Sequence, residues 1–519
     1  MPEEPTSDPA PPEGERSPPA GAGVWVPGRR LLTVGLILLI TFVAAEALAV
    51  ATVMPTVEQD LGDLGLYGWV FSGFFLGSLL GIVAAGRASD RMRPVVPFAV
   101  GLALFLLGLA IAGAAGSMPV LVAARVLQGV GAGALPTVAY VAIGREYPPA
   151  ARPRMFALLS TAWVVPSLVG PAAAAVVGEQ FGWRWVFLGL IPLVALCGIG
   201  VMGSVSRIGT PARPAEPPTE PLSDGSIEAP VAPGGKADLR DAVVLTLGAG
   251  LTLWGLERAQ PVLAIAATAV GLMLLVPAFR RLTPPGTLSA RPGLPAAVLI
   301  RGVLTFAFFS ADAFVPLSLT SVRGTTPRFA SLAITLCALT WTAGSWTQER
   351  YVARHGPRPL VRGGFAFVGA GVVLMMVTLV PGVPVALGVL AWGVAGLGIG
   401  MAYSPLSVTA LAEAGHGHEG MATAGLQLSD VLGIALGTGI AGVVVGAGDR
   451  ASWSPRPALL IVMAMSLAMS MLGVLLVGRL PRRVISAEGA EHHPLEDIIS
   501  GAAQQPPAPV DDGAPRPWM

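Results

Sequence analysis

The stretch RVLQGVGAGALP, from Arg125 to Pro136, places an arginine and a glutamine inside a long apolar run. That run extends over about residues 119–144, which is enough for a helix to cross a lipid bilayer. Similar runs recur along nearly the whole chain of 519 residues, which is 53% hydrophobic and only 12% charged. Soluble proteins carry about 25% charged residues, so the composition predicts an all-α, multi-pass membrane protein.

Fourteen such runs are expected to span the membrane. Six come before a segment rich in proline and glutamate, two shorter ones follow it, and six more complete the set. The expected spans are 31–54, 67–87, 95–115, 119–144, 155–178, 184–204, 241–256, 261–279, 295–320, 328–347, 360–380, 384–410, 420–446 and 457–478. An even number of spans places both ends of the chain on the same side of the membrane.

This order predicts two six-helix bundles with a linker and a pair of inserted helices between them. The first span is too long to be the apolar part of a cleaved signal peptide. The expected segments are a disordered tail at 1–30, a first bundle at 31–204, a polar linker at 205–240, two inserted helices at 241–280, a second bundle at 295–478 and a second disordered tail at 484–519.

Arginine is unevenly distributed between the expected loops. The first loop on one side carries Glu58, Asp60 and Asp63 and no basic residue. The loops on the other side contain Arg87, Arg91, Arg93, Arg145, Arg152, Arg154, Arg280, Arg281, Arg350, Arg354, Arg358 and Arg362. By the positive-inside rule, the arginine-rich loops, the linker and both tails are expected in the cytoplasm. Scarce lysine beside abundant arginine and alanine is typical of a GC-rich bacterial genome, so we expect a bacterial inner membrane.

A pattern in the first expected span recurs in the ninth. The stretches AEALAVATVMP, at 45–55, and ADAFVP, at 311–316, each place a carboxylate between alanines ahead of a proline. The two carboxylates, Glu46 and Asp312, lie near the middle of their spans. Two similar bundles with a binding site between them are a recurrent transporter plan, although coincidence among apolar helices would also produce such a match.

Charged residues inside hydrocarbon are costly unless they are paired or hydrated, so they are functional candidates. Glu46 and Asp312 are expected to load and release protons, one from each bundle. The alternative for Asp312 is a structural role in a pair with a neighbouring helix. Arg125 is expected to face a cavity or a partner, and the alternative is that it lies near the outer interface and extends outward.

Glycines recur at every fourth position of the second expected span, at Gly73, Gly77 and Gly81. Because glycine has no side chain, this spacing predicts that another helix packs closely against the span.

Four stretches together resemble the major facilitator superfamily and, within it, the fourteen-span drug:proton antiporters. They are GRASDRMRP at 86–94, RVLQGVGAGALP at 125–136, WVVPSLVGP at 163–171, and Glu46 nine residues before Pro55, where the family often has an aspartate. The resemblance covers the membrane-embedded chain and not the tails. It implies two six-helix bundles, transport by alternating access, and export coupled to protons.

The resemblance also implies a cytoplasmic gate formed by Gly86, Asp90 and Arg91. Asp90 would contact the start of the helix near 419–425, where a helix N-terminus favours negative charge. Gly86 would allow a neighbouring backbone to approach. The chain departs from the family's pattern at the tight turn that follows, where Arg93 replaces the usual second glycine.

Two further motifs carry implied roles. Arg125, Gln128 and Gly129 imply proton transfer or control of the electrostatics of the cavity. Pro166, Gly170 and Pro171 match a signature of antiporters rather than symporters, which favours export. The family's following glycine pair is replaced by Ala174 and Ala175, which are also small.

The expected substrate cavity is largely apolar and favours hydrophobic, cationic substrates, because a carboxylate also neutralises a bound cation. Its expected lining residues are Met54, Trp163, Phe308, Phe309, Phe314, Gln427 and Asp430. The alternative for Asp430 is that it caps a helix end near the cytoplasmic loop.

Enzymatic and ATP-driven functions are not expected, because no phosphate-binding glycine loop, nucleophile triad or zinc spacing occurs. The proton gradient is the expected energy source, with no cofactor. His416 and His418 share a loop without a third ligand, so no metal site is expected. Cys197 and Cys337 lie in apolar runs as small hydrophobic residues.

The net charge of +1 indicates no nucleic-acid partner. The expected partners are protons, a hydrophobic small molecule and the lipid bilayer, and we expect a monomer. Three other functions stay open. An exporter of lipids or lipid-linked molecules would have side openings between spans. A nutrient symporter is disfavoured by the motif at 163–171. A membrane sensor without transport would carry a folded soluble domain, which the tails do not suggest.

Overall fold

The computed structural model describes residues 24–26, 29–148, 164–208, 239–414 and 419–482, and single residues at 151, 155, 158, 159 and 162. The disorder expected for the tails and the linker falls almost wholly outside these described residues. So do Trp163, His416 and His418.

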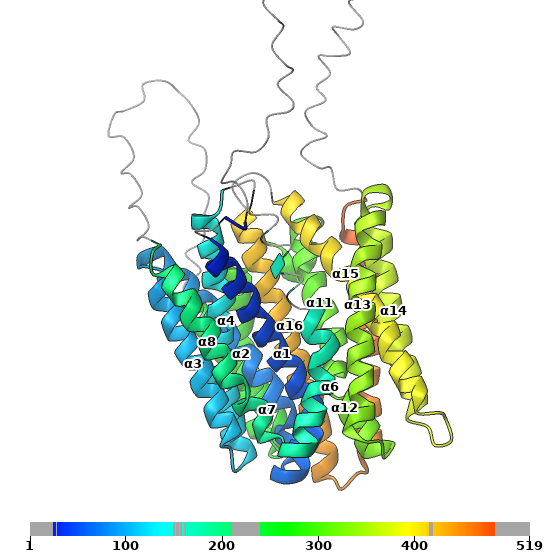
Figure 1. Ribbon diagram of the computed structural model, residues 1–519. Helices are drawn as coiled ribbons and strands as arrows, with labels where there is room; N and C mark the ends of the chain where they lie inside the picture. The colour runs from blue at the N-terminus through cyan, green and yellow to red at the C-terminus, as the bar shows by residue number, and fades with distance from the viewer. Residues whose placement is uncertain are drawn as a thin grey trace, which may run out of the picture.

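The described chain forms helices that run side by side as one bundle (Figure 1). They are α1 (Arg30–Leu61), η2 (Leu64–Leu66), α2 (Tyr67–Arg91), α3 (Val95–Gly113), α4 (Met118–Glu146), α6 (Val164–Phe181), α7 (Arg184–Leu188), α8 (Leu190–Val205), α9 (Leu239–Glu257), α10 (Pro261–Leu282), η4 (Thr287–Ser289), α11 (Leu294–Asp312), α12 (Val315–Leu317), η5 (Ser318–Val322), α13 (Pro327–His355), α14 (Pro357–Thr378), α15 (Ala386–Glu413), α16 (Glu419–Arg450), α17 (Pro455–Leu476) and η6 (Val477–Arg479).

Thirteen helical segments of the described chain are long and apolar enough to cross a membrane, and a shorter apolar helix occupies Leu168–Phe181 within α6. Together they correspond to the fourteen expected spans, so the protein is a multi-pass membrane protein. Below, the tail end of the bundle is the end at which α1 begins and η6 finishes. The opposite end is the loop end.

Two of the spans differ from their predicted form. The first span was expected to end at residue 54, before Pro55, and this end is wrong, because α1 continues to Leu61 and stops at Gly62, which has a φ of 68°. The proline lacks an N–H donor, but the surrounding side chains of α1 are deeply buried and their packing offsets the lost hydrogen bond. The ninth span is interrupted after Asp312, where α11 ends, and the short helices α12 and η5 continue it to Val322.

Close packing of α2 against α4 confirms the glycine prediction. A Cβ atom added to Gly77 would lie 2.2 Å from the carbonyl oxygen of Val126, and one on Gly81 would lie 2.0 Å from that of Val130. In the other direction, a Cβ on Gly129 would lie 2.0 Å from the carbonyl oxygen of Phe74. Glycine on both helices therefore lets the two backbones touch.

The second half of the chain repeats this contact between α13 and α15. A Cβ atom on Gly396 would lie 2.2 Å from the carbonyl oxygen of Cys337, and one on Gly400 would lie 2.1 Å from that of Trp341. Gly129 and the glycine four residues later make the matching contacts in the first half. The helix pairs α2–α4 and α13–α15 therefore occupy equivalent places in two related six-helix halves.

Gly129→Ala is expected to lower the free energy of unfolding by about 1–3 kcal/mol, because the new methyl group overlaps the Phe74 carbonyl and forces α2 away from α4. Thermal unfolding of the detergent-solubilised protein measures this loss. Gly144→Ala, on the same helix but with open space around its Cβ position, is the control and should leave the Tm unchanged. Equal Tm values for Gly129→Ala and Gly144→Ala would show that α4 does not pack tightly against α2 at Gly129.

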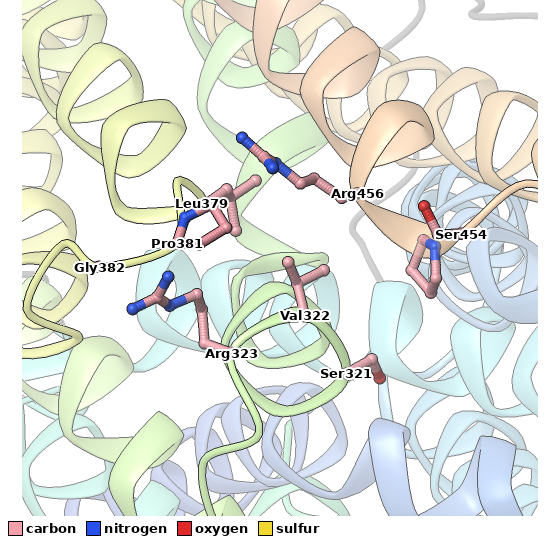
Figure 2. A pocket seen from close by; sticks show the side chains of 9 residues that line it. Ser321, Val322, Arg323, Leu379, Pro381, Gly382, Ser454 and Arg456 are labelled. Carbon is pink, nitrogen blue, oxygen red and sulfur yellow. The ribbon is translucent and has the colours of Figure 1, made fainter.

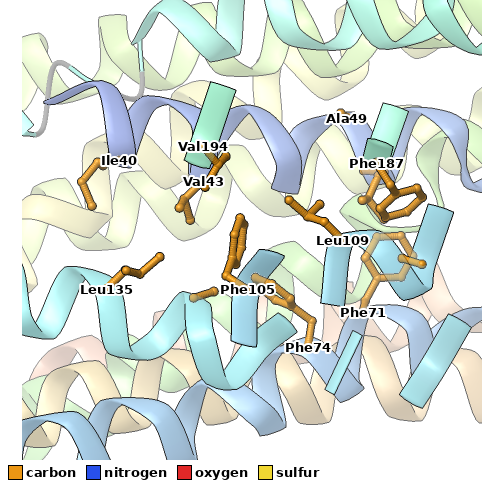
Figure 3. Packing of buried hydrophobic residues seen from close by; sticks show 14 of the residues in the cluster. Ile40, Val43, Ala49, Phe71, Phe74, Phe105, Leu109, Leu135, Phe187 and Val194 are labelled. Atoms are coloured by element: carbon orange, nitrogen blue, oxygen red, sulfur yellow. The ribbon is translucent and has the colours of Figure 1, made fainter. Parts of the chain in front are cut away.

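Two large apolar cores occupy the bundle, and the first, which lies mainly in the first half, also includes side chains of the second half such as Phe314 and Leu459. In the first half, side chains from α1, α2, α3, α7 and α8 meet, including Val43, Phe74, Phe105 and Phe187 (Figure 3). The second core joins α11 to α13, α14, α15 and α17. The inserted helices α9 and α10 form a third cluster with α2 and α16, one helix from each half.

The two halves are joined by contacts at the loop end of the bundle. A Cβ atom on Gly68 of α2 would lie 2.4 Å from the Cα atom of Gly442 of α16. The hydroxyl group of Tyr67 donates to the carbonyl oxygen of Ala313 at 3.4 Å. Arg328 of α13 forms an ion pair with Glu179 of α6. These contacts hold the halves together at the loop end.

Candidate functional site

Glu46 and Arg125 form an ion pair in the interior of the first half. Nη1 of Arg125 donates to Oε1 of Glu46 and also to Oε1 of Gln128, at 2.7 Å from the latter. Only 1% of the Glu46 side chain and 2% of the Arg125 side chain are exposed. Nε of Arg125 donates to the carbonyl oxygen of Val70 at 3.2 Å. Arg125 therefore turns into the bundle rather than outward to the interface, which excludes the alternative of an outward-extending side chain.

The pair does not satisfy every polar atom. Oε2 of Glu46 and Nε2 of Gln128 are buried without a hydrogen-bond partner in the described part of the chain. The guanidinium of Arg125 lies over the ring of Phe74, 4.1 Å from its centroid. Glu46 thus keeps one oxygen available to accept a proton or a further donor.

Asp312 ends α11 and has a different partner. The indole Nε1 of Trp392 donates to Oδ1 of Asp312 at 2.7 Å. The residue is half-buried, and no ion pair to it occurs among the described residues. The charge of this carboxylate is therefore not balanced by a neighbouring cation.

The partners of the two carboxylates occupy equivalent positions. Trp392 precedes Gly396 by four residues on α15, just as Arg125 precedes Gly129 by four residues on α4. Glu46 and Asp312 lie on the first helices of their halves, α1 and α11. The first half therefore pairs its carboxylate with a cation and the second pairs its carboxylate with an indole.

A second buried ion pair lies between α11 and α16, and the sequence interpretation missed its cation. Nε of Arg301 donates to Oδ1 of Asp430 at 2.8 Å, and Nη1 donates to the carbonyl oxygen of Tyr403 at 2.6 Å. The Tyr403 hydroxyl donates to Oδ2 of Asp430 at 2.8 Å. Asp430 lies well inside α16, so it does not cap the helix that begins at Glu419. The signal was available, because Arg301 falls inside the apolar run 295–320.

Asp430→Asn is expected to lower the free energy of unfolding by about 1–3 kcal/mol, because it leaves the Arg301 guanidinium largely buried without an anion. Thermal unfolding in detergent measures the change. The double variant Arg301→Gln/Asp430→Asn removes both charges and should recover most of the loss. A double variant that is as unstable as the sum of the single variants would contradict the pairing.

Aromatic rings connect the two carboxylates of the second half. Phe308 lies between Trp392 and Trp341, with ring centroids 5.3 and 5.7 Å away. Trp341 in turn lies 5.6 Å from the ring of Tyr403. Trp341 and Tyr403 are partly exposed, as is Phe309, whereas Phe308 is fully buried.

The other expected lining residues vary in exposure. Met54 and Phe314 are fully buried in the first apolar core. In this conformation they therefore lie behind the surface of the expected substrate cavity and do not line it. Gln427 is half-buried on α16. No hydrogen bond joins Glu46 to Asp312, and neither residue lines the two hollows at the loop end.

The expected gate residues lie at the tail end. Asp90 and Arg91 are exposed at the end of α2, and Asp90 makes no hydrogen bond to the described part of α16. The close approach expected at Gly86 is not found, because a Cβ there would meet the Thr137 methyl group at an ordinary 3.7 Å. The hydrogen bond and the ion pair that join the two halves among the described residues, Tyr67–Ala313 and Arg328–Glu179, lie at the loop end, away from Asp90.

The motif at 163–171 packs beside the first carboxylate. Pro166 and Pro171 are buried in α6, and Pro171 lies within the helix. A Cβ atom on Gly170 would lie 3.9 Å from the carbonyl oxygen of Ala45, the residue before Glu46. The described part of the motif therefore lies against α1 next to Glu46, at an ordinary packing distance.

These features define a polytopic helical membrane protein made of two related six-helix halves, each with a carboxylate on its first helix, fully buried in the first half and half-buried in the second. A family model described as Major Facilitator Superfamily matches residues 34–288. This match places residues 34–288, just under half of the chain, in the major facilitator superfamily.

Individual relatives extend this comparison. The chain is 28% identical over 400 residues to a probable multidrug-efflux transporter of Mycobacterium tuberculosis, which covers 76% of this chain and 83% of the relative. It is 32% identical over 167 residues to multidrug resistance protein 3 of Bacillus subtilis, covering 32% of this chain and 33% of that protein. The crystal structure of an auto-inhibited POT family peptide transporter matches with a TM-score of 0.62 at 14% identity, over 86% of this chain and 97% of that one. This last likeness concerns the fold alone.

Proposed function

We propose that the protein is a proton-coupled exporter of hydrophobic, cationic small molecules, as in drug efflux. The names of the relatives in M. tuberculosis and B. subtilis support the efflux class. The observation that carries the proposal is the matched pair of carboxylates, Glu46 with a cation as partner and Asp312 with an indole. Such an asymmetry provides one carboxylate held in a salt bridge and one free to change its charge.

Asp312 is the proposed site of proton exchange. A charged carboxylate with no cation nearby is costly in a low-dielectric interior, so it is stabilised either by a proton or by a cationic substrate. The two compete for the same carboxylate, which is the requirement for antiport. The partly exposed rings of Phe309, Trp341 and Tyr403 would provide the apolar and cation–π contacts for the rest of the substrate.

The Glu46–Arg125 pair would couple charge to the arrangement of helices. If Glu46 takes up a proton, the Arg125 guanidinium loses its anion while still buried, and the uncompensated charge favours a rearrangement of α1 against α4. Gln128, which accepts from Arg125, would hold the guanidinium during this change.

The proposed transport cycle alternates access between the two ends of the bundle. The tail end carries the arginine-rich loops and would face the cytoplasm by the positive-inside rule, with both termini on that side. In the conformation described, the Arg328–Glu179 pair and the Gly68–Gly442 contact close the loop end. Opening toward the outside would break these contacts, and Asp90 would then latch the tail end. The protein would act as a monomer in a bacterial inner membrane, driven by the proton gradient without a cofactor.

Reconstitution of the purified chain into liposomes tests this function. With an acidic lumen and a neutral exterior, the aromatic cation ethidium should accumulate in the lumen in exchange for protons, and a protonophore should abolish the accumulation. Protein-free liposomes are the control. No accumulation of ethidium, together with gradient-independent flipping of a fluorescent phospholipid, would contradict the proposal and favour a lipid exporter.

A further inference from the structure

A hollow of about 430 Å³ lies at the loop end of the second half (Figure 2), and neither Glu46 nor Asp312 lines it. The end of η5, the turn between α14 and α15, and the start of α17 enclose it. Its lining residues are Ser321, Val322, Arg323, Leu379, Pro381, Gly382, Ser454, Pro455 and Arg456. Two of these nine are arginines and none is acidic.

The first arginine is held in place by the backbone. Nη1 of Arg323 donates to the carbonyl oxygen of Val380 at 2.6 Å, and Nη2 donates to that of Val383 at 2.5 Å. Its Nε is buried and has no hydrogen-bond partner in the described part of the chain. The guanidinium is therefore fixed in orientation while one of its donors lacks an acceptor.

The second arginine has even fewer partners. Nε of Arg456 is also buried without an acceptor among the described residues, and no hydrogen bond or ion pair of its guanidinium occurs there. Figure 2 shows the side chains of Arg323 and Arg456 both extending toward the turn that contains Leu379 and Pro381. Two positive charges therefore adjoin one hollow with unsatisfied donors, an arrangement that is costly without an anion.

The helix geometry adds to the positive potential. The 22-residue helix α17 begins at Pro455, and Ser454 precedes it in an extended conformation. Because Pro455 and Pro457 have no N–H, the first turn presents only the free N–H groups of Arg456 and Ala458 at this end. A helix N-terminus favours an anion, and arginine binds the oxygens of a phosphate group with good geometry.

We propose that this hollow binds a phosphate group through Arg323 and Arg456. The phosphate belongs either to the headgroup of an anionic phospholipid or to free inorganic phosphate. The loop end of the bundle lies at the level where the membrane meets water, so headgroup phosphates are available there. The site is separate from the carboxylates, and its existence does not depend on the transport function proposed above.

Thermal unfolding of the full chain in a neutral detergent tests this site with two probes, phosphatidylglycerol and inorganic phosphate. Phosphatidylcholine and chloride are the reference ligands. A bound phosphate should raise the Tm of the wild-type protein by about 2–4 °C relative to its reference. A rise with phosphatidylglycerol alone identifies a lipid headgroup as the source, and a rise with both probes identifies a site that also takes free phosphate.

Three variants show where the effect arises. Arg456→Met removes a guanidinium that makes no recorded hydrogen bond, so it should fold normally and lose the Tm rise. Arg323→Gln should lose it as well. Arg258→Gln, an exposed arginine stacked on Trp254 at the same end, is the charge-matched control and should keep it. The proposal is overturned if neither probe raises the Tm, if Arg456→Met keeps the rise, or if Arg258→Gln loses it equally.

Discussion

Arg125→Gln is expected to abolish transport and to lower the free energy of unfolding by about 3–5 kcal/mol, because it leaves the fully buried Glu46 carboxylate without its cation. The effect is large because Glu46 is fully buried, so water cannot solvate its carboxylate once the guanidinium is removed. The guanidinium also donates to Gln128 and to the carbonyl oxygen of Val70, and a glutamine side chain cannot reproduce all of these bonds.

Thermal unfolding and ethidium transport in liposomes measure these two losses separately. The double variant Glu46→Gln/Arg125→Gln removes both charges, so it should regain most of the stability while remaining inactive. Arg184→Gln is the matched control, since Arg184 forms an ion pair with Asp60 in which both side chains are well exposed. Exposed pairs contribute about 0–1 kcal/mol, so this variant should unfold like the wild type. Equal losses in the free energy of unfolding for Arg184→Gln and Arg125→Gln would contradict the claim that burial makes the Glu46–Arg125 pair costly to break.

Asp312→Asn is expected to reduce proton-driven exchange to the level of protein-free liposomes while leaving the fold intact. The asparagine oxygen can still accept the hydrogen bond from Trp392, so the contact between α11 and α15 survives. What the variant lacks is a group that can gain or lose a proton. Its Tm should equal or exceed that of the wild type, because the substitution removes a charge that no cation balances.

Accumulation of ethidium against an imposed pH gradient measures this loss. Asp60→Asn, at the loop end and well exposed, removes the same charge outside the bundle interior and should transport normally. Retention of full gradient-driven accumulation by Asp312→Asn would mean that Asp312 serves packing alone, the structural role considered for it from the sequence.

The order of the spans was predictable because each needs only a long apolar run. The packing of α2 against α4 was predictable for a similar reason, since glycines at every fourth position mark a close contact whatever the partner. The end of α1 was not predictable, because a proline such as Pro55 ends a helix only where packing does not compensate for its missing hydrogen bond. Local signals therefore predicted the elements better than their ends.

Pairings between distant helices were harder to predict. Arg301 and Asp430 are 129 positions apart, and no local pattern says that their helices meet at this register. The contact of Asp90 with the start of α16 was expected from the family motif, and Asp90 makes no hydrogen bond to the described part of that helix.

The partner of Asp312, Trp392, could have been predicted from the spacing of glycines along the chain. Trp392, Gly396 and Gly400 repeat the spacing of Arg125, Gly129 and Gly133, so an alignment of the glycines would have placed the indole opposite the carboxylate. If the glycines are taken only as sites of close helix packing, the equivalence of Trp392 with Arg125 is not apparent. In this chain the carboxylate pattern indicated the repeat, and the glycine spacing indicates the partner of Asp312.

Proton release on binding tests the central claim most directly. Ethidium is added to the purified protein in weakly buffered detergent solution, with the pH recorded by a soluble indicator and binding recorded by tryptophan fluorescence. The wild-type protein should release protons as ethidium binds, and Asp312→Asn should bind ethidium, if more weakly, without releasing any. Equal proton release from the wild type and from Asp312→Asn at matched occupancy would contradict the assignment of Asp312 as the site of exchange.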